Sequence, residues 1–316
     1  MSWDEISEAL FVDRAAPNPE APVTPFVALQ RVVVRLLFDP AFVERVYAQP
    51  ETALAGLEVD RDLVKQLLTN DRRLWNADRL RRSRSLKILM DEFKVTSTLV
   101  LAERGELAFL DAFFGSSFFH EAVKQRRYMA LAFAAYLEDA IRRRQVGSRH
   151  LRAVLGLEAA MARSRRLLRE ARRGLDAALR GVGNGPSGER WAAQPGVLAH
   201  FAPANVIGVV QHVEKYLFQI GQVPALALCR DAPRPEPLPE IDERSPTPFL
   251  LEPRPGGKVD LSEVDAGYAR VVEACERPVD DEALASAVAP HGITSERARE
   301  MAGSLLEAGV LRRVGG

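Results

Sequence analysis

The stretch FFGSSFFH, residues 113–120, says most about how this chain folds. It places four phenylalanines within seven residues, on both sides of a short Gly-Ser-Ser turn. So many aromatic rings present more apolar surface than a loop can leave in water. We therefore expect the four rings to be buried, either inside the fold or against a partner protein.

Helical periodicity surrounds this block on both sides. Apolar residues between Phe26 and Leu37 fall on one helical stripe, and Asp39-Pro40 ends that helix before a second segment begins. Further helices are predicted over residues 61–68, 78–101, 106–113, 119–144 and 150–178. Residues 26–180 are thus predicted to form an all-α partner-binding domain. A flexible, proline-containing arm over residues 1–25 is predicted to precede it.

The composition changes beyond this domain. Residues 181–196 are rich in Gly, Pro and Ser and are typical of a linker. Residues 197–230 are expected to hold a connecting helix, over 205–220, and a short strand, over 225–229. Residues 231–247 contain five prolines, which favours an extended connector over packed structure.

The last segment, residues 248–316, has the element order of a winged helix. Pro255-Gly256-Gly257 separates two short apolar stretches, 249–251 and 258–261, and this pattern indicates a β-hairpin. Three helices and a closing strand are predicted after it, over residues 263–274, 280–289, 295–307 and 310–314. The predicted fold class is therefore mainly α, with an N-terminal helical domain followed by a small α+β winged-helix domain.

The formal net charge of zero hides two regions of opposite charge. Residues 141–173 carry eleven Arg and two Glu, whereas residues 231–316 carry seventeen acidic and ten basic side chains. The arginines of the first region could face a nucleic acid, an acidic protein or the chain's own acidic C-terminal segment, or form a solvated helix face. Six of these arginines could form one such stripe: Arg149, Arg152, Arg163, Arg166, Arg169 and Arg173.

A winged helix has two common uses, which make opposite demands on charge. DNA binding needs clustered Lys and Arg to neutralise phosphates, yet the third predicted helix has a net charge of minus one. A DNA-binding transcriptional regulator that adds the arginine-rich helix stays an alternative. The other use is peptide capture, in which an extended peptide joins the hairpin edge as an extra strand.

Peptide capture needs an open edge and a partly apolar groove beside it. The candidate residues lie on the hairpin and on the third helix of the segment: Lys258, Val259, Leu261, Arg297, Met301 and Leu305. The apolar members of this set could equally form the core of the small domain itself.

Signals for catalysis are weak. Gly115-Ser116-Ser117 lacks the second glycine of a nucleophile elbow, and the glycines of residues 181–188 are not followed by the lysine of a P-loop. The five histidines are scattered, so we predict no catalytic residue, metal site or cofactor. An enzyme would need groups that converge from distant positions.

Cysteine usage and the N-terminus favour a cytoplasmic protein. Cys229 and Cys275 are too few for a disulfide framework, which suits a reducing compartment. The first ten residues hold three acidic side chains and no basic one, unlike a secretory signal. No apolar run reaches the roughly 20 residues of a membrane helix.

Residues 26–140 resemble a known family in four motifs. These are Leu37-Phe38-Asp39-Pro40-Ala41-Phe42, Trp75-x-x-Asp78-x-x-Arg81, a Leu-rich helix that ends near Phe93, and the block at 113–120. They resemble the partner proteins of multinuclear non-heme iron oxidases, the methanobactin-type partner family. The resemblance implies a heterodimer with a TIM-barrel iron enzyme that modifies a ribosomally made peptide. On this basis we expect the oxidase interface at Phe113, Phe114, Phe118, Phe119 and His120.

The C-terminal segment, about residues 246–315, is similar to the recognition element of ribosomal peptide natural product (RiPP) biosynthesis, a small winged helix. In that element a leader peptide joins the third strand and lies along the third helix. These elements correspond here to Lys258–Leu261 and Glu296–Leu305. Together the two resemblances imply a non-catalytic accessory subunit that binds a precursor peptide and presents it to the oxidase. They leave the peptide and the chemistry open, and the stretch from Gly181 to Cys229 matches neither family.

Overall fold

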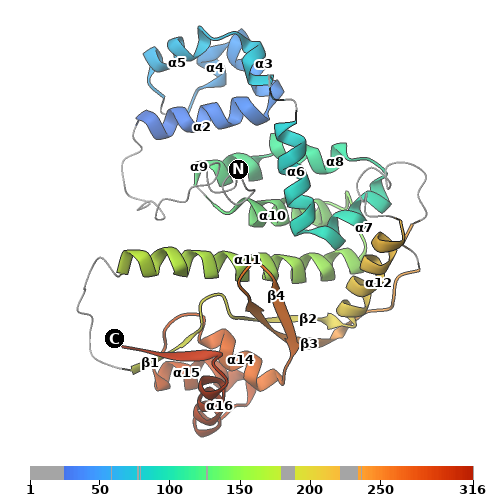
Figure 1. Ribbon diagram of the computed structural model, residues 1–316, viewed down its shortest axis with the longest axis vertical. Helices are drawn as coiled ribbons and strands as arrows, with labels where there is room; N and C mark the ends of the chain where they lie inside the picture. Colours follow the sequence, from blue (N-terminus) through green and yellow to red (C-terminus); the bar gives the residue numbers. More distant parts are fainter. Residues whose placement is uncertain are drawn as a thin grey trace. The chain divides into compact units, whose positions relative to one another are not determined.

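The computed structural model describes residues 25–57, 59–76, 78, 80–125, 127–178, 189–220, 234–235 and 237–315. These residues are mainly helical and include two small antiparallel sheets (Figure 1). They divide into two compact units, one up to Val146 and one that starts at Gly147 and holds the C-terminal helices and all the described strands. The predicted arm, apart from Pro25, and the strand predicted over 225–229 lie outside the described residues.

The first unit consists of helices in its described part. They are α2 (Pro25–Phe38), α3 (Pro40–Ala48), α4 (Pro50–Ala53), α5 (Arg61–Leu68), η1 (Arg72–Asn76), α6 (Arg81–Glu92), α7 (Lys94–Arg104), α8 (Ala108–Asp111), η2 (Ala112–Gly115), α9 (Ser117–Lys124) and α10 (Met129–Arg142). The predicted break at Asp39-Pro40 is confirmed. Asp39 caps α3 by accepting a hydrogen bond from Phe42 N at 2.9 Å, and Pro40 fits the first turn because that turn needs no N–H donor there.

Two long predicted helices are each divided in the structure. The helix predicted over 78–101 is interrupted at Phe93, between α6 and α7, and the helix predicted over 119–144 is interrupted between α9 and α10. Phe93 is fully buried and packs edge-on against Phe133, with ring centroids 5.7 Å apart. Neither break contains a glycine or a proline, and the apolar periodicity continues through both. The sequence therefore gives no signal for where these helices end.

In its described part, the second unit combines a long helix, five strands and a C-terminal group of helices. Its elements are α11 (Arg149–Ala178), β1 (Glu189–Ala193), β2 (Leu198–Ala204), α12 (Val206–Gln219), β3 (Asp242–Pro253), β4 (Val259–Glu263), α14 (Ala266–Ala274), α15 (Asp281–Val288), η3 (Ala289–His291), α16 (Ser295–Glu307) and β5 (Leu311–Gly315). The predicted hairpin is β3–β4, and Gly256 and Gly257 at its tip have φ values of +88° and +84° that favour glycine.

The main sheet has the strand order β2-β3-β4 and is antiparallel throughout. Helix α11 packs on one face of this sheet and α14 on the other. On the α14 face, Leu250 joins a buried cluster with Val272 and Met301. On the α11 face, Gly196 lies so close to the helix that an added Cβ would be 2.7 Å from the Ser164 carbonyl oxygen. Strands β1 and β5 form a separate two-stranded sheet.

These pairings correct the predicted domain boundaries. Helix α11 belongs to the C-terminal unit, so the division falls between residues 146 and 147 and not at 180. The predicted linker over 181–196 contains β1, the predicted connector over 197–230 contains β2, and the predicted connector over 231–247 contains the start of β3. The hairpin, the three helices and the last strand occur as predicted, but β5 pairs with β1, and residues 248–316 are not a self-contained winged helix.

Among the described helices, none combines the length and the apolar composition needed to cross a membrane. The longest of the described helices, α11, carries eight arginines.

Candidate functional site

Strand β4 is an edge of the main sheet, because within the described residues it pairs with β3 alone. The hydrogen bonds that flank this ladder run from Arg254 N to Lys258 O at 2.8 Å and from Val264 N to Pro248 O at 3.1 Å. In an antiparallel pair, alternate residues face the partner strand. The backbone N–H and C=O groups of Val259, Leu261 and Glu263 therefore point away from β3, toward the open side.

The side chains of the same residues lie on the α11 face of the sheet. Val259 is opposite Pro253 and Leu261 is opposite Leu251, and directly opposite residues share a face. Pro253 is on the α11 side, since its Cγ would be 2.6 Å from a Cβ added at Gly196. Val259 and Leu261 are both half-buried, so apolar surface flanks the open backbone groups of the edge.

The predicted groove residues on α16 take other positions. Met301 and Leu305 are buried in the cluster between α14, α15 and α16, and a Cβ at Gly267 would lie 2.5 Å from Met301 Cε. Their place in the core corrects the expectation that they line an open groove. Arg297 is exposed and pairs with Glu300 at 2.8 Å, and Lys258 is exposed at the hairpin tip. The structure thus brings Lys258, Val259 and Leu261 together at the edge and separates Met301 and Leu305 from it.

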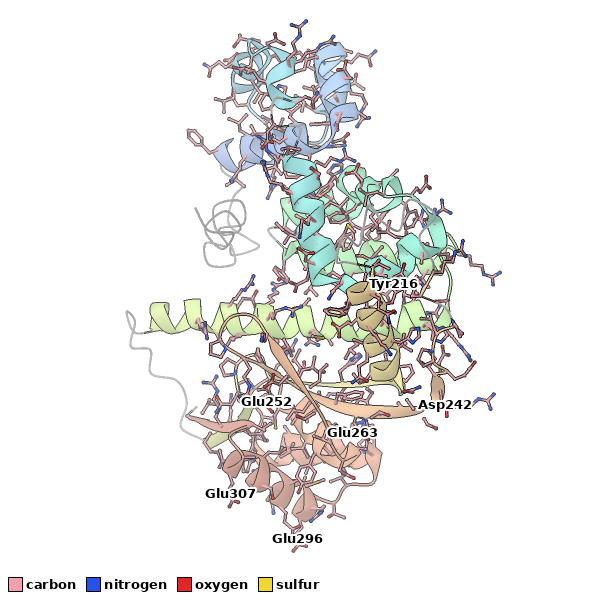
Figure 2. All side chains as sticks on the ribbon, turned by 45° about the vertical axis from the view of Figure 1, so that its right-hand side comes forward. Tyr216, Asp242, Glu252, Glu263, Glu296 and Glu307 are labelled. Carbon is pink, nitrogen blue, oxygen red and sulfur yellow. The ribbon has the colours of Figure 1, made fainter. Side chains whose placement is uncertain are left out.

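The exposed surface of α16 carries three glutamates, Glu296, Glu300 and Glu307, against two arginines, Arg297 and Arg299. Figure 2 shows Glu296 and Glu307 on α16 and Glu263 at the end of β4, and all three are exposed. A helix that enters the major groove of DNA would bring these carboxylates close to phosphates. The described surface therefore disfavours DNA binding through α16.

The arginines of α11 differ in their exposure and in the contacts they make. Arg149 pairs with Glu240 and Arg163 with Glu276, the latter at 2.6 Å, so these two face acidic residues of the C-terminal segment, one of the predicted possibilities. Arg166 pairs with Glu170 on the same helix at 2.6 Å. Arg152 and Arg169 are exposed, and the side chain of Arg173 is not among those described. The sequence did not single out Arg165, whose Nη1 donates to Gly257 O at 3.5 Å at the hairpin tip.

The aromatic block lies in the buried interior of the first unit. Phe113, Phe114 and Phe119 are at most 1% exposed, and their rings contact one another with centroids 5.3–5.6 Å apart. Phe38 and Phe133 extend this cluster. Only Phe118 is half-buried. The three buried rings therefore pack against the protein's own helices, which corrects the expectation that they contact a partner.

The Gly-Ser-Ser turn explains how the block folds. Ser116 adopts an extended conformation between η2 and α9, and its hydroxyl accepts a hydrogen bond from Phe119 N at 3.3 Å. The same hydroxyl donates to Phe113 O at 2.6 Å. One serine thus caps α9 and holds the preceding turn, which turns rings from two helical segments toward one centre.

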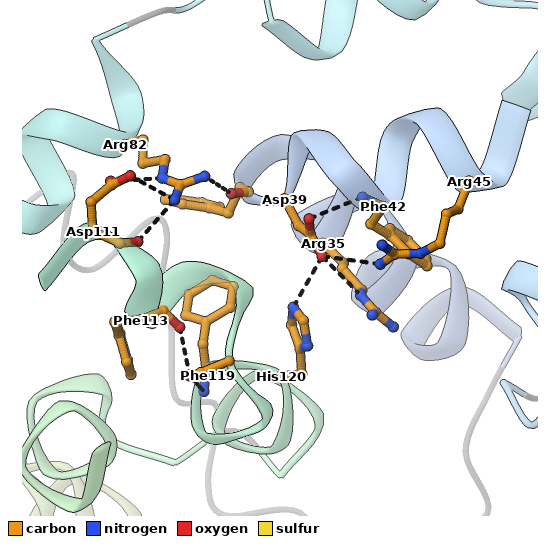
Figure 3. Close-up of polar contacts among 11 residues, drawn as sticks. Arg35, Asp39, Phe42, Arg45, Arg82, Asp111, Phe113, Phe119 and His120 are labelled. Carbon is orange, nitrogen blue, oxygen red and sulfur yellow. Dashed lines mark hydrogen bonds and ion pairs between the residues drawn. The ribbon is translucent and has the colours of Figure 1, made fainter. Parts of the chain in front are cut away.

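A polar cluster lies beside this core (Figure 3). The Asp39 carboxylate is buried, and its Oδ2 lies 3.7 Å from Arg35 Nε, 3.6 Å from Arg45 Nη2 and 3.8 Å from His120 Nε2. The Arg35 guanidinium stacks on the Phe42 ring at 3.9 Å. Burial, followed by the nearby Arg35 charge, lowers the pKa of His120 to about 4, and Asp39 only partly opposes this shift. His120 is thus a neutral, structural residue near pH 7.

Other motif residues also have structural partners. Trp75 Nε1 donates to the Tyr47 hydroxyl at 2.9 Å, and the Asp78 carboxylate pairs with Arg81 and Arg84. Sequence reasoning missed Arg82, whose guanidinium reaches both the Asp111 side chain and Phe38 O. Arg82 thereby links α6 to the segment that leads into the aromatic block. No local sequence pattern distinguishes Arg82 from the neighbouring arginines.

A metal site requires several converging ligands, and a reactive thiol requires a lowered pKa. Within the described part of the chain, no group of three or more His, Cys, Asp or Glu side chains is placed to hold a metal ion. Burial raises the pKa of the Cys275 thiol to about 12, which keeps it protonated and unreactive. Cys229 lies outside the described residues.

No protein-family model matches the sequence, and neither does any curated protein.

Proposed function

We propose that this chain is a non-catalytic accessory protein that captures an extended precursor peptide as an added strand on β4. The observation that carries the proposal is the open edge itself. Three residues of β4 direct their backbone donors and acceptors away from β3, and half-buried Val259 and Leu261 lie beside them. An extended peptide meets both demands, because its backbone completes the ladder and alternate side chains cover the apolar surface.

The identity of the second partner rests on the resemblance of residues 26–140. On that resemblance we propose a heterodimer with an iron-dependent TIM-barrel oxidase that modifies the captured peptide in RiPP biosynthesis. With three of the rings buried, the oxidase needs another contact surface on the first unit. Leu74 and Leu80 are 56% and 63% exposed and flank the Trp75-x-x-Asp78 motif, so we place the contact there.

A proline at Val259 tests peptide capture with little damage to the protein. The Val259 N–H faces away from β3, so Val259→Pro removes an outward donor and leaves the β3–β4 ladder bonds in place. We expect a labelled precursor peptide to lose at least about tenfold in affinity. The measurement is fluorescence anisotropy with the full-length protein.

Val259→Ala is the matched control, since it trims the side chain and keeps the N–H. It should retain most of the affinity, and both variants should still co-purify with the oxidase. Equal affinity of wild type and Val259→Pro for a peptide that binds would remove the strand-addition proposal.

A further inference from the structure

We infer that the peptide captured on β4 carries acidic side chains where it passes the hairpin tip, and that arginines of α11 select it. This inference rests on the proposed function, because it names the class of peptide that the β4 edge would take. It follows from the path of α11, the charge of its second half and the pleat of the sheet.

The path of α11 leads from the middle of the sheet to the hairpin tip. Near its first half, a Cβ added at Gly156 would be 3.8 Å from the His200 imidazole on β2. Further along, Leu168 approaches Gly196, and Arg165 Nη1 reaches Gly257 O at 3.5 Å. Figure 1 shows the tip of the β3–β4 hairpin beside the middle of α11. The second half of α11 therefore continues past the start of β4.

This second half is strongly basic on the side that meets the tip. Arg165, Arg169 and Arg172 are spaced four and three residues apart, which places them on one face of the helix. Arg169 and Arg172 are exposed, as is Lys258 at the tip. Four cations thus gather at one end of the β4 edge, whereas Glu263 and Asp265 lie at the other end. Carboxylates are the complementary groups for the first end and are repelled at the second.

The pleat decides which peptide residues meet the arginines. In an added strand, alternate side chains lie on the same face as Val259 and Leu261, which is the α11 face. The others lie with Asp260 and Ser262, where Asp260 already pairs with Arg254 at 2.6 Å. Only the peptide side chains on the α11 face meet the arginines. Of these, the residues near Val259 and the hairpin tip should be acidic, and the residue beside Leu261 should be apolar.

The test uses three fluorescein-labelled decapeptides of sequence Thr-Val-Thr-Val-Thr-Xaa-Thr-Xaa-Thr-Xaa, with Glu, Gln or Lys at Xaa, so that the apolar residues and the variable residues share one face of the added strand. At low salt we expect the full-length protein to bind the acidic peptide about tenfold tighter than the neutral one, and the basic peptide most weakly. The double variant Arg165→Gln/Arg169→Gln should bind the acidic and neutral peptides equally. Arg152→Gln, which removes an exposed arginine from the first half of α11, is the matched control and should keep the preference.

Each other outcome has a separate meaning. If the three peptides bind equally and Val259→Pro abolishes all three, strand addition stands and selection by the arginines is overturned. If none of them binds, and precursor peptides do not bind either, both proposals fall. If a ten-nucleotide oligothymidine binds, is lost in the double variant and is unaffected by Val259→Pro, the arginines serve nucleic acid and the inference is overturned.

Discussion

The aromatic block of the first unit and the β4 edge of the second differ in how clearly the amino-acid sequence shows them and in the surface they present. The block is the most conspicuous motif in the sequence, yet three of its four rings are buried and serve the fold. The β4 edge is five residues of ordinary composition, yet it presents open backbone groups beside apolar side chains. A conspicuous motif therefore indicates what a fold needs to form, while a binding surface can arise from where a plain segment ends up.

The strongest test of this comparison removes a ring from the block. Phe113→Ala deletes a fully buried side chain among four aromatic neighbours, and we expect a loss of about 3–5 kcal/mol in the free energy of unfolding. Urea denaturation followed by circular dichroism measures it. Half-buried Phe118→Ala should cost clearly less.

The comparison also predicts where partner contacts are lost. Leu74→Ser/Leu80→Ser should leave the urea midpoint nearly unchanged and weaken co-purification with the oxidase, because both side chains are exposed. A Phe113→Ala protein that is as stable as wild type but no longer associates would show that the block is an interface after all.

A second test concerns the strands that come from distant parts of the chain. Trp191 on β1 is buried, and its Nε1 donates to Asp281 Oδ1 at 2.6 Å, at the start of α15. Trp191→Phe leaves that carboxylate oxygen without its donor, so we expect about 2 kcal/mol of destabilisation. The matched control is Trp75→Phe in the first unit, where the indole also donates one hydrogen bond but is only half-buried. Equal, small effects in thermal melts would mean that β1 does not stabilise the second unit.

The smallest expected effect is a pH dependence in the first unit. The pKa of His120 is lowered to about 4 in the folded protein, so between pH 6.5 and pH 4 the unfolded chain binds more protons than the folded one. Stability is thus lost as the pH falls through this window, by about 1 kcal/mol between pH 7.5 and pH 5.5. The groups that face the imidazole are Arg35, Asp39, Arg45 and Glu121. His120→Gln should make the urea midpoint less dependent on pH over this range. An unchanged pH dependence in this variant would show that other groups cause the loss of stability.

Local signals in the sequence predicted local structure well. The Asp39-Pro40 break, the Pro255-Gly256-Gly257 turn and the three C-terminal helices depend on neighbouring residues, and the structure contains all of them. The pairing of β1 with β5 and of β2 with β3 joins segments separated by more than 35 residues, which no local pattern encodes. The position of Val259 and Leu261 on the hairpin depends on the local turn signal, so the sequence predicts it. The burial of Met301 and Leu305 depends on how three helices pack together, which the sequence pattern does not show.

Amide hydrogen exchange of β4, measured by NMR with and without a bound precursor peptide, tests strand addition most directly. The account predicts an alternating pattern: the outward amides of Val259, Leu261 and Glu263 exchange quickly in the free protein and become protected in the complex. The amides of Asp260 and Ser262, which face β3, should be protected in both states. Unchanged exchange at the three outward amides, together with new protection on α16, would contradict capture of the peptide as an added strand on β4.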